Sequence, residues 1–194
     1  THTGVGHQVG RFAMRGDRTL FVFVFTDPNP EIPEGLARQK AHLRERFSRS
    51  GWECANILGA LEHVDTLYID RVSQIRMDRW TQGRVALVGD AAFCVSLLGG
   101  QGSALAMTAA YVLAGELKRA NGDHVTAFAA YQQRLGAFIA GKQQAAVKLS
   151  PFFAPTSRFR LFLRNQITKV LAIPFVMRLA VGRELRDRID LPQY

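Results

Sequence analysis

Disulfides, membrane spans and metal sites are features that this sequence lacks. Of its 194 residues two are cysteines, Cys54 and Cys94, and two thiols without nearby ligands form neither a disulfide framework nor a metal site. No apolar run approaches the roughly 20 residues of a membrane-spanning helix, and no secretory leader is recognisable. We therefore expect a protein of the reducing cytoplasm. Because Thr1 rather than methionine comes first, we also expect the chain to be processed, tagged or cut from something longer.

Acidic residues are scarce relative to basic ones, and the formal net charge is +9. From residue 158 onward, eight basic residues stand against three acidic ones. Such a tail suits an acidic partner, an anionic cofactor, nucleic acid or a membrane surface, but it also suits a solvated helix face. Because no helix-turn-helix, zinc or aromatic-platform motif accompanies the charge, we expect no nucleic-acid partner. Contact with a membrane surface stays open and is not favoured.

The most informative stretch begins with the apolar run Val85–Val88, which is typical of a strand buried on both faces. The string Gly89–Ala92 (Gly-Asp-Ala-Ala) ends that strand, and the glycine-rich string Gly99–Gly102 then opens a helical pattern over residues 103–117. Strand, glycine-rich loop and helix in this order form a cradle for a phosphate or cofactor, because glycines admit a ligand close to the backbone and a helix N-terminus presents unpaired N–H groups. Asp90 alone is a weak signal, since aspartate is a common turn residue.

The complete string resembles the second FAD motif of the class A flavoprotein monooxygenases, the hydroxylases of aromatic compounds and polyketides. The resemblance implies that Asp90 accepts hydrogen bonds from the ribityl hydroxyls of FAD. It also implies that the N–H groups of Ser103 and Ala104 stabilise the negative charge that the reduced flavin carries around N1 and the C2 oxygen. The cofactor-binding residues implied in this way are Gly89, Asp90, Gly99, Gly100, Gln101, Gly102, Ser103 and Ala104.

The resemblance also implies a reaction. NADH or NADPH would reduce FAD, O₂ would add at the flavin C4a, and the hydroperoxide would pass one oxygen atom to an aromatic or polyketide-like small molecule. No side chain stands out as catalytic, because the histidines at positions 7, 42, 63 and 124 are scattered over unlike elements. Two alternatives remain open: an FAD-dependent reductase of isoprenoid-type lipids, which carries a similar second motif, and a non-enzymatic basic binding module. A flavin halogenase is not favoured, because Trp52 and Trp80 form no Trp-x-Trp motif.

Several positions depart from the family pattern. Phe93 stands where the family usually has histidine, Ser96-Leu97 where it has a proline pair, and Ala104 and Ala109 where it has asparagine and an acidic residue. The first FAD motif, strand then Gly-x-Gly-x-x-Gly then helix, is absent. The run Gly4–Gly10 is only superficially similar, because we expect no strand before it and a strand rather than a helix after it. The chain therefore resembles a C-terminal half that needs an N-terminal half of the same protein to hold FAD.

The expected fold class is α+β, with antiparallel strands of a substrate-binding domain, a strand-loop-helix piece of an FAD-binding domain, and C-terminal helices. We place the substrate-sheet part at 1–82, the FAD-motif segment at 83–122 and the helical region at 123–194. Strands are predicted as a hairpin over 7–25, one or two strands over 66–77, and a strand over 85–88. Helices are predicted over 34–47, 52–61, 103–117, 124–149, 156–171 and 174–185, with a break at Pro151.

Overall fold

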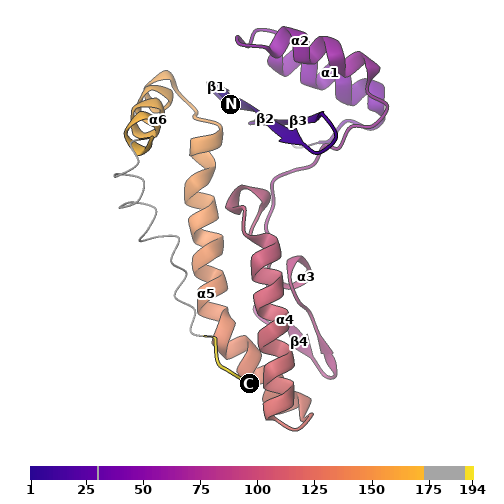
Figure 1. Ribbon diagram of the computed structural model, residues 1–194, viewed down its shortest axis with the longest axis vertical. Coiled ribbons are helices and arrows are strands. Elements are labelled where there is room, and N and C mark those ends of the chain that lie inside the picture. Colours follow the sequence, from indigo (N-terminus) through magenta and orange to yellow (C-terminus); the bar gives the residue numbers. More distant parts are fainter. Residues whose placement is uncertain (30, 173–190) are drawn as a thin grey trace. The chain divides into compact units, whose positions relative to one another are not determined.

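The computed structural model describes residues 1–29, 31–172 and 191–194 (Figure 1). The chain divides into two compact units. The first comprises residues 1–71 and 151–181, and the second comprises residues 72–150 and 182–194. Helices combined with small antiparallel sheets confirm the α+β class. The division into three functional segments after residues 82 and 122 stays a prediction, and the helix expected over 174–185 lies outside the described residues.

The first unit contains a three-stranded antiparallel sheet, β1 (His2–Gly4), β2 (His7–Met14) and β3 (Arg18–Phe25), in the order β1-β2-β3. Strands β2 and β3 confirm the hairpin predicted over residues 7–25. Strand β1 corrects the expectation that no strand precedes the glycine run, since it occupies His2–Gly4 itself. Gly6, at φ 77°, makes the turn into β2, so the run continues as a strand, as expected, and not as the helix of a dinucleotide-binding loop.

Two helices follow the sheet, and both begin later than predicted. Helix α1 (Leu36–Phe47) starts after Gly35, whose φ is 82°, and α2 (Cys54–Ala60) starts after Trp52, whose φ is 60°. A right-handed helix needs negative φ values, so neither residue can belong to one. A 3₁₀ turn, Leu61–His63, ends α2.

The core of the first unit is aromatic and centres on Phe47, which is fully buried. The rings of Phe23 and Phe25 meet it edge to face at centroid distances of 4.9 and 5.7 Å, a favourable arrangement for aromatic pairs. Phe23 and Phe25 therefore pack against the buried core. The buried members of the cluster are Val9, Leu43, Phe47, Cys54, Ile57, Leu58 and Leu61.

Helix α6 (Arg158–Leu171) completes the described part of the first unit. Its N-cap is Ser157, whose hydroxyl accepts a hydrogen bond from the backbone N–H of Arg160 at 3.2 Å. The cap places the start of the helix two residues after the predicted Thr156, because the Ncap residue itself has extended backbone angles. The end at Leu171 agrees with the prediction.

The second unit is mainly helical. Helices α4 (Gly102–Arg119) and α5 (His124–Phe153) confirm the predictions over 103–117 and 124–149. Between them Asn121 and Gly122 have φ values of 51° and 84°, and Asp123 caps α5 by accepting from the N–H of Val125 at 3.1 Å. The shorter elements are β4 (Thr81–Gln82), β5 (Val85–Ala86), α3 (Asp90–Phe93) and the 3₁₀ turn Leu97–Gly99.

Three predictions for this part of the chain were wrong. Pro151 lies inside α5 rather than ending the preceding helix. A proline so near the C-terminus of a helix removes one backbone hydrogen bond and leaves the rest of the helix intact. Residues 66–77 form no strand, because no described strand lies beside them to complete a ladder. The run Val85–Val88 is a strand only at Val85–Ala86, paired with β4, and Val85 is 63% exposed rather than buried on both faces.

The core of the second unit lies between α4, α5 and the loop segments that precede them. Its buried members are Trp80, Ala92, Phe93, Val95, Leu105, Ala109, Val112, Tyr131, Leu135 and Ile139. None of the described helices is both long and apolar enough to cross a membrane.

Candidate functional site

The structure brings Asp90 and Gly102 together, two residues of the predicted cofactor site that are twelve positions apart. Asp90 is exposed at the start of α3, and Gly102 is the first residue of α4. A Cβ atom placed on Gly102 would lie 3.6 Å from Oδ1 of Asp90. The carboxylate therefore stands beside the N-terminus of α4, and the lack of a side chain at Gly102 leaves space between them.

The N-terminus of α4 is open to a ligand. Its N-cap residue, Gln101, makes no side-chain cap hydrogen bond, and the bond from the Leu105 N–H to the Gln101 carbonyl, at 3.0 Å, is the first of the helix. The N–H groups of Ser103 and Ala104 precede that bond, and both residues are exposed. Such N–H groups carry the partial positive charge of the helix dipole. A ligand here can donate hydrogen bonds to a carboxylate and place negative charge at a helix end.

Gly89 serves the site through packing. Its φ is 66°, in the region that favours glycine, and a Cβ atom on it would lie 3.0 Å from Cβ of Ala106 in α4. A larger residue would push α4 away from the turn that carries Asp90. Gly89 therefore sets the spacing between the carboxylate and the helix.

The loop between α3 and α4 is shaped by Ser96 and Gly100. Ser96 has a φ of 89°, unusual for a residue with a side chain, and its hydroxyl accepts from the N–H of Leu98 at 3.2 Å. That bond restrains the loop where the resembled family has prolines. Gly100, at φ 63°, has open space around it, whereas a Cβ atom on Gly99 would meet Ala146 at 3.5 Å. Of this glycine pair, Gly100 leaves room for a ligand and Gly99 packs on α5.

Glutamine side chains support this loop, and sequence reasoning missed them. Nε2 of Gln143 in α5 donates to the carbonyl of Ile75 at 2.6 Å, and Nε2 of Gln74 donates to the carbonyl of Val95 and to the backbone carbonyl of Gln143, each at 2.9 Å. Gln143 is buried at 7% exposure. A signal existed: Gln143 shares the buried face of α5 with Ile139, four residues earlier, and a polar residue on such a face needs a partner.

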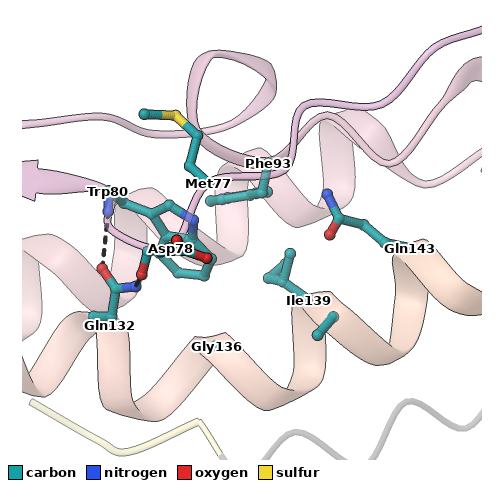
Figure 2. Close-up of a pocket in the computed structure, with 9 residues that line it drawn as sticks. Met77, Asp78, Trp80, Phe93, Gln132, Gly136, Ile139 and Gln143 are labelled. Atoms are coloured by element: carbon teal, nitrogen blue, oxygen red, sulfur yellow. Dashed lines mark hydrogen bonds between the residues drawn. The ribbon is translucent and has the colours of Figure 1, made fainter.

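A small cavity of about 170 Å³ lies between α5 and the segment before β4 (Figure 2). Figure 2 shows the amide of Gln132 bridging this segment: its Oε1 accepts from the Trp80 N–H at 2.9 Å, and its Nε2 donates to the Asp78 carbonyl at 2.7 Å. The lining includes Phe93, the residue that departs from the family's histidine, and none of the eight residues predicted to bind the cofactor. Neither Asp90 nor Gly102 lines this cavity.

Two histidines and a buried tyrosine make contacts within the fold. His7 shares a hydrogen bond with the Ser50 hydroxyl at 2.9 Å, and Nε2 of His42 lies 2.7 Å from Asp27. Burial raises the pKa of Tyr131 to about 12, and its hydroxyl donates to the Leu87 carbonyl at 3.1 Å. No group of histidine, cysteine or carboxylate side chains within the described ranges could hold a metal ion.

Comparison with known proteins adds the family. The family described as "FAD binding domain" matches residues 33–132. A flavin-dependent monooxygenase from an unknown prokaryotic organism is 41% identical over 182 residues, covering 93% of this chain and 45% of the relative. Another from Legionella longbeachae serogroup 1 (strain NSW150) is 40% identical over 157 residues, covering 80% of this chain and 38% of the relative.

A solved structure agrees with these relatives. The tetracycline destructase Tet(55) superimposes with a TM-score of 0.75 at 35% identity, covering 100% of this chain and 49% of that protein. The chain thus spans about half the length, or less, of the proteins that it matches.

Proposed function

This chain belongs to the FAD-binding-domain family of the flavin-dependent monooxygenases, and on that premise we propose that it is the C-terminal portion of such an enzyme. The proposed reaction is the hydroxylation of an aromatic or polyketide-like small molecule with NADH or NADPH and O₂. The observation that carries the proposal is the pairing of the Asp90 carboxylate with the uncapped N-terminus of α4 across a glycine.

The residues around Asp90 and the N-terminus of α4 fit one half of FAD. Asp90 would accept hydrogen bonds from the ribityl hydroxyls, and the lack of a side chain at Gly102 would leave space for the cofactor beside it. The N–H groups of Ser103 and Ala104 would stabilise negative charge on the flavin without a cationic side chain. When bound, FAD supplies the transfer of electrons from the nicotinamide and the activation of O₂. Of the remaining predicted residues, Gly89 packs against α4, and Gly99, Gly100 and Gln101 belong to the loop before that helix.

The sheet of the first unit supplies a substrate surface. Helices α1 and α2 cover the face that carries Val9 and Phe23, and the opposite face holds the cross-strand pair Phe12 and Leu20, which are 52% and 46% exposed. Met14 extends this exposed apolar face. Aromatic and aliphatic side chains on an open sheet face suit a flat, apolar ring system. We propose this face as the wall that contacts the substrate.

The partner of the chain is an N-terminal half of the same protein. The relatives are about twice as long as the matched region, and no described segment forms the strand, glycine loop and helix that would hold the ADP part of FAD. Val85, with 63% of its surface exposed in a run suited to a buried strand, is the position that such a half would cover.

The test is flavin binding by the full-length gene product. Asp90→Asn removes the charge while keeping the shape, and we expect at least about tenfold weaker FAD binding from the loss of charge-assisted hydrogen bonds. Asp17→Asn is the matched control, because Asp17 is an exposed turn residue at φ 53°, which asparagine tolerates. The measurement is FAD fluorescence during titration of the apoprotein.

Two outcomes would contradict the proposal. Equal FAD affinity for both variants would show that Asp90 does not contact FAD. A protein that binds FAD but reduces an isoprenoid double bond, with no substrate-dependent O₂ consumption, would be a reductase.

A third substitution tests the sheet face proposed to contact the substrate. Phe12→Ala should raise KM for the hydroxylated substrate and leave flavin content unchanged.

A further inference from the structure

Residues 191–194 lie beside the C-terminal half of α4, where the C label stands in Figure 1. The hydroxyl of Tyr194 donates to Oε1 of Glu116 at 2.7 Å, and the guanidinium of Arg119 lies 4.9 Å from the centre of the Tyr194 ring. The ring of Tyr111 meets the Tyr194 ring at a centroid distance of 5.4 Å, and its hydroxyl donates to the Pro192 carbonyl at 2.9 Å. Hydroxyl, ring and backbone of this segment therefore each have a partner.

Gly115 forms the notch that receives the ring. A Cβ atom on Gly115 would lie 2.0 to 2.3 Å from three ring atoms of Tyr194, closer than atoms can approach. Glycine in a helix interior is less favourable than alanine by roughly 1 kcal/mol, so its presence here calls for a reason. The seat of the Tyr194 ring supplies one, since any side chain at position 115 would occupy the same space.

Glu116 makes the notch selective for a phenol. It is 3% exposed, and its Oε1 lies 3.0 Å from Nε of Arg134 and 3.6 Å from Nη1 of Arg119. The two guanidinium groups compensate the buried charge and fix the carboxylate as a hydrogen-bond acceptor. Burial and the hydrogen bond to Glu116 raise the pKa of Tyr194 to about 12, so the phenol stays a neutral donor throughout the neutral pH range. A phenylalanine ring would fill the notch but would not donate the second hydrogen bond that Oε1 of Glu116 accepts beside the one from Arg134.

We propose that α4 carries a tyrosine-recognition site whose occupant is the segment Leu191–Tyr194 of this chain, and that occupancy of the site stabilises the α4–α5 pair. The site is independent of the flavin-binding end of α4 and goes beyond the monooxygenase function. Recognition combines a ring seat on glycine, a cation over the ring and a buried carboxylate for the hydroxyl. A chain that ends before Leu191 presents the site empty and binds the peptide Leu-Pro-Gln-Tyr in trans.

Two glycine substitutions in the full-length protein test the ring seat. Gly115→Ala adds a methyl group inside the Tyr194 ring, whereas Gly141→Ala adds one to an exposed position of α5 with open space around it. Both should favour the helix by propensity. We expect Gly141→Ala to raise the unfolding temperature slightly, and Gly115→Ala to lower it. Equal behaviour of the two variants would overturn the proposal.

A binding measurement keeps the test decisive if Gly115→Ala does not fold. The full-length protein without residues 191–194 is titrated with fluorescently labelled Leu-Pro-Gln-Tyr and Leu-Pro-Gln-Phe, followed by anisotropy. We expect saturable binding of the tyrosine peptide and about tenfold weaker binding of the phenylalanine peptide, because a hydrogen bond to a charged acceptor is lost. Absence of binding, or equal affinity for the two peptides, would contradict the proposal. FAD is absent from this assay, so its result does not depend on the flavin site.

Discussion

The two units of the molecule are held together by different kinds of interaction. In the first unit the sheet and the helices α1 and α2 pack around a cluster of apolar rings centred on Phe47. In the second unit the chain from residue 72 to residue 100 has little regular structure. There, side chains of α5 such as Gln143 and Tyr131 donate hydrogen bonds to backbone carbonyls of that segment.

This difference shows where each unit depends on individual residues. Apolar rings lose stability in proportion to the contacts that are removed. Where a side chain donates hydrogen bonds to backbone carbonyls, stability depends on that single donor, because its loss leaves a buried carbonyl without a partner. The cofactor motif belongs to the second kind of unit, so the geometry of a glycine-rich loop rests on glutamines and a tyrosine elsewhere in the sequence.

The largest effect is expected in the apolar core. Phe47→Ala removes a fully buried ring that contacts Phe23 and Phe25, and should lower the free energy of unfolding by about 3–5 kcal/mol. Denaturant titration followed by circular dichroism measures it. Phe159→Ala is the control, because that ring is 73% exposed and its removal should change little. Equal losses for the two variants would mean that the ring cluster is not the core of the first unit.

The second prediction concerns such a donor. Gln143→Leu fills the same space but withdraws the donor from the carbonyls of Ile75 and Cys94, and should cost about 1–3 kcal/mol. Gln144→Leu changes the same residue type at an exposed neighbouring position and should be nearly neutral. Hydrogen exchange in residues 72–100 should rise in the first variant alone. An unchanged exchange pattern would show that apolar contacts hold residues 72–100 in place. The two units would then not differ in the kind of interaction that stabilises them.

The smallest effect is expected at Tyr131. Tyr131→Phe removes the hydrogen bond to the Leu87 carbonyl and should cost about 1 kcal/mol at neutral pH. Its folded pKa of about 12 lies above the ordinary value of 10.0, so the unfolded chain loses this proton first. The stability that depends on the neutral phenol is therefore present below pH 10 and is lost as the pH rises towards 12.

Alkaline unfolding curves check the sign of this effect. Between pH 10 and 12 the wild-type protein should lose stability more steeply than Tyr131→Phe, and the two should converge at the upper end of that range. Tyr68→Phe is the control at pH 7, since Tyr68 is 85% exposed and its loss should leave the free energy of unfolding nearly unchanged. If the free energies of unfolding of wild type and Tyr131→Phe change in parallel with pH, the pKa of Tyr131 is not raised by folding, and its hydroxyl is in contact with water.

Much of the fold could be predicted from local sequence. The hairpin over 7–25 follows from alternating β-branched and aromatic residues, and α4 and α5 follow from apolar residues at helical spacing and from the Asn121-Gly122-Asp123 stop and cap. The errors arose where local preference is overruled. Trp52 adopts a positive φ inside a helical pattern, and residues 66–77 alternate like a strand but have no described neighbour to pair with.

The candidate site divides in the same way. Its residue types and their order, the carboxylate after a strand and the glycines before a helix, are local properties that the sequence displays, and they carry the resemblance to the flavin monooxygenases. That resemblance implied eight contact residues without distinguishing their roles. The structure separates Gly102, which leaves space beside Asp90, from Gly89 and Gly99, which pack against Ala106 and Ala146.

The sequence by itself determined the class of the protein, the helices, the hairpin and the position of the motif, because these depend on periodicity and on residues within a few positions of one another. Tertiary structure alone decided which glycines face open space, which glutamine bridges which carbonyl, and that Tyr194 lies against Gly115, 79 positions away. The physical reason is that helical and strand patterns depend on the spacing of apolar residues only a few positions apart. A close approach between distant residues is fixed only when packed side chains exclude every other arrangement.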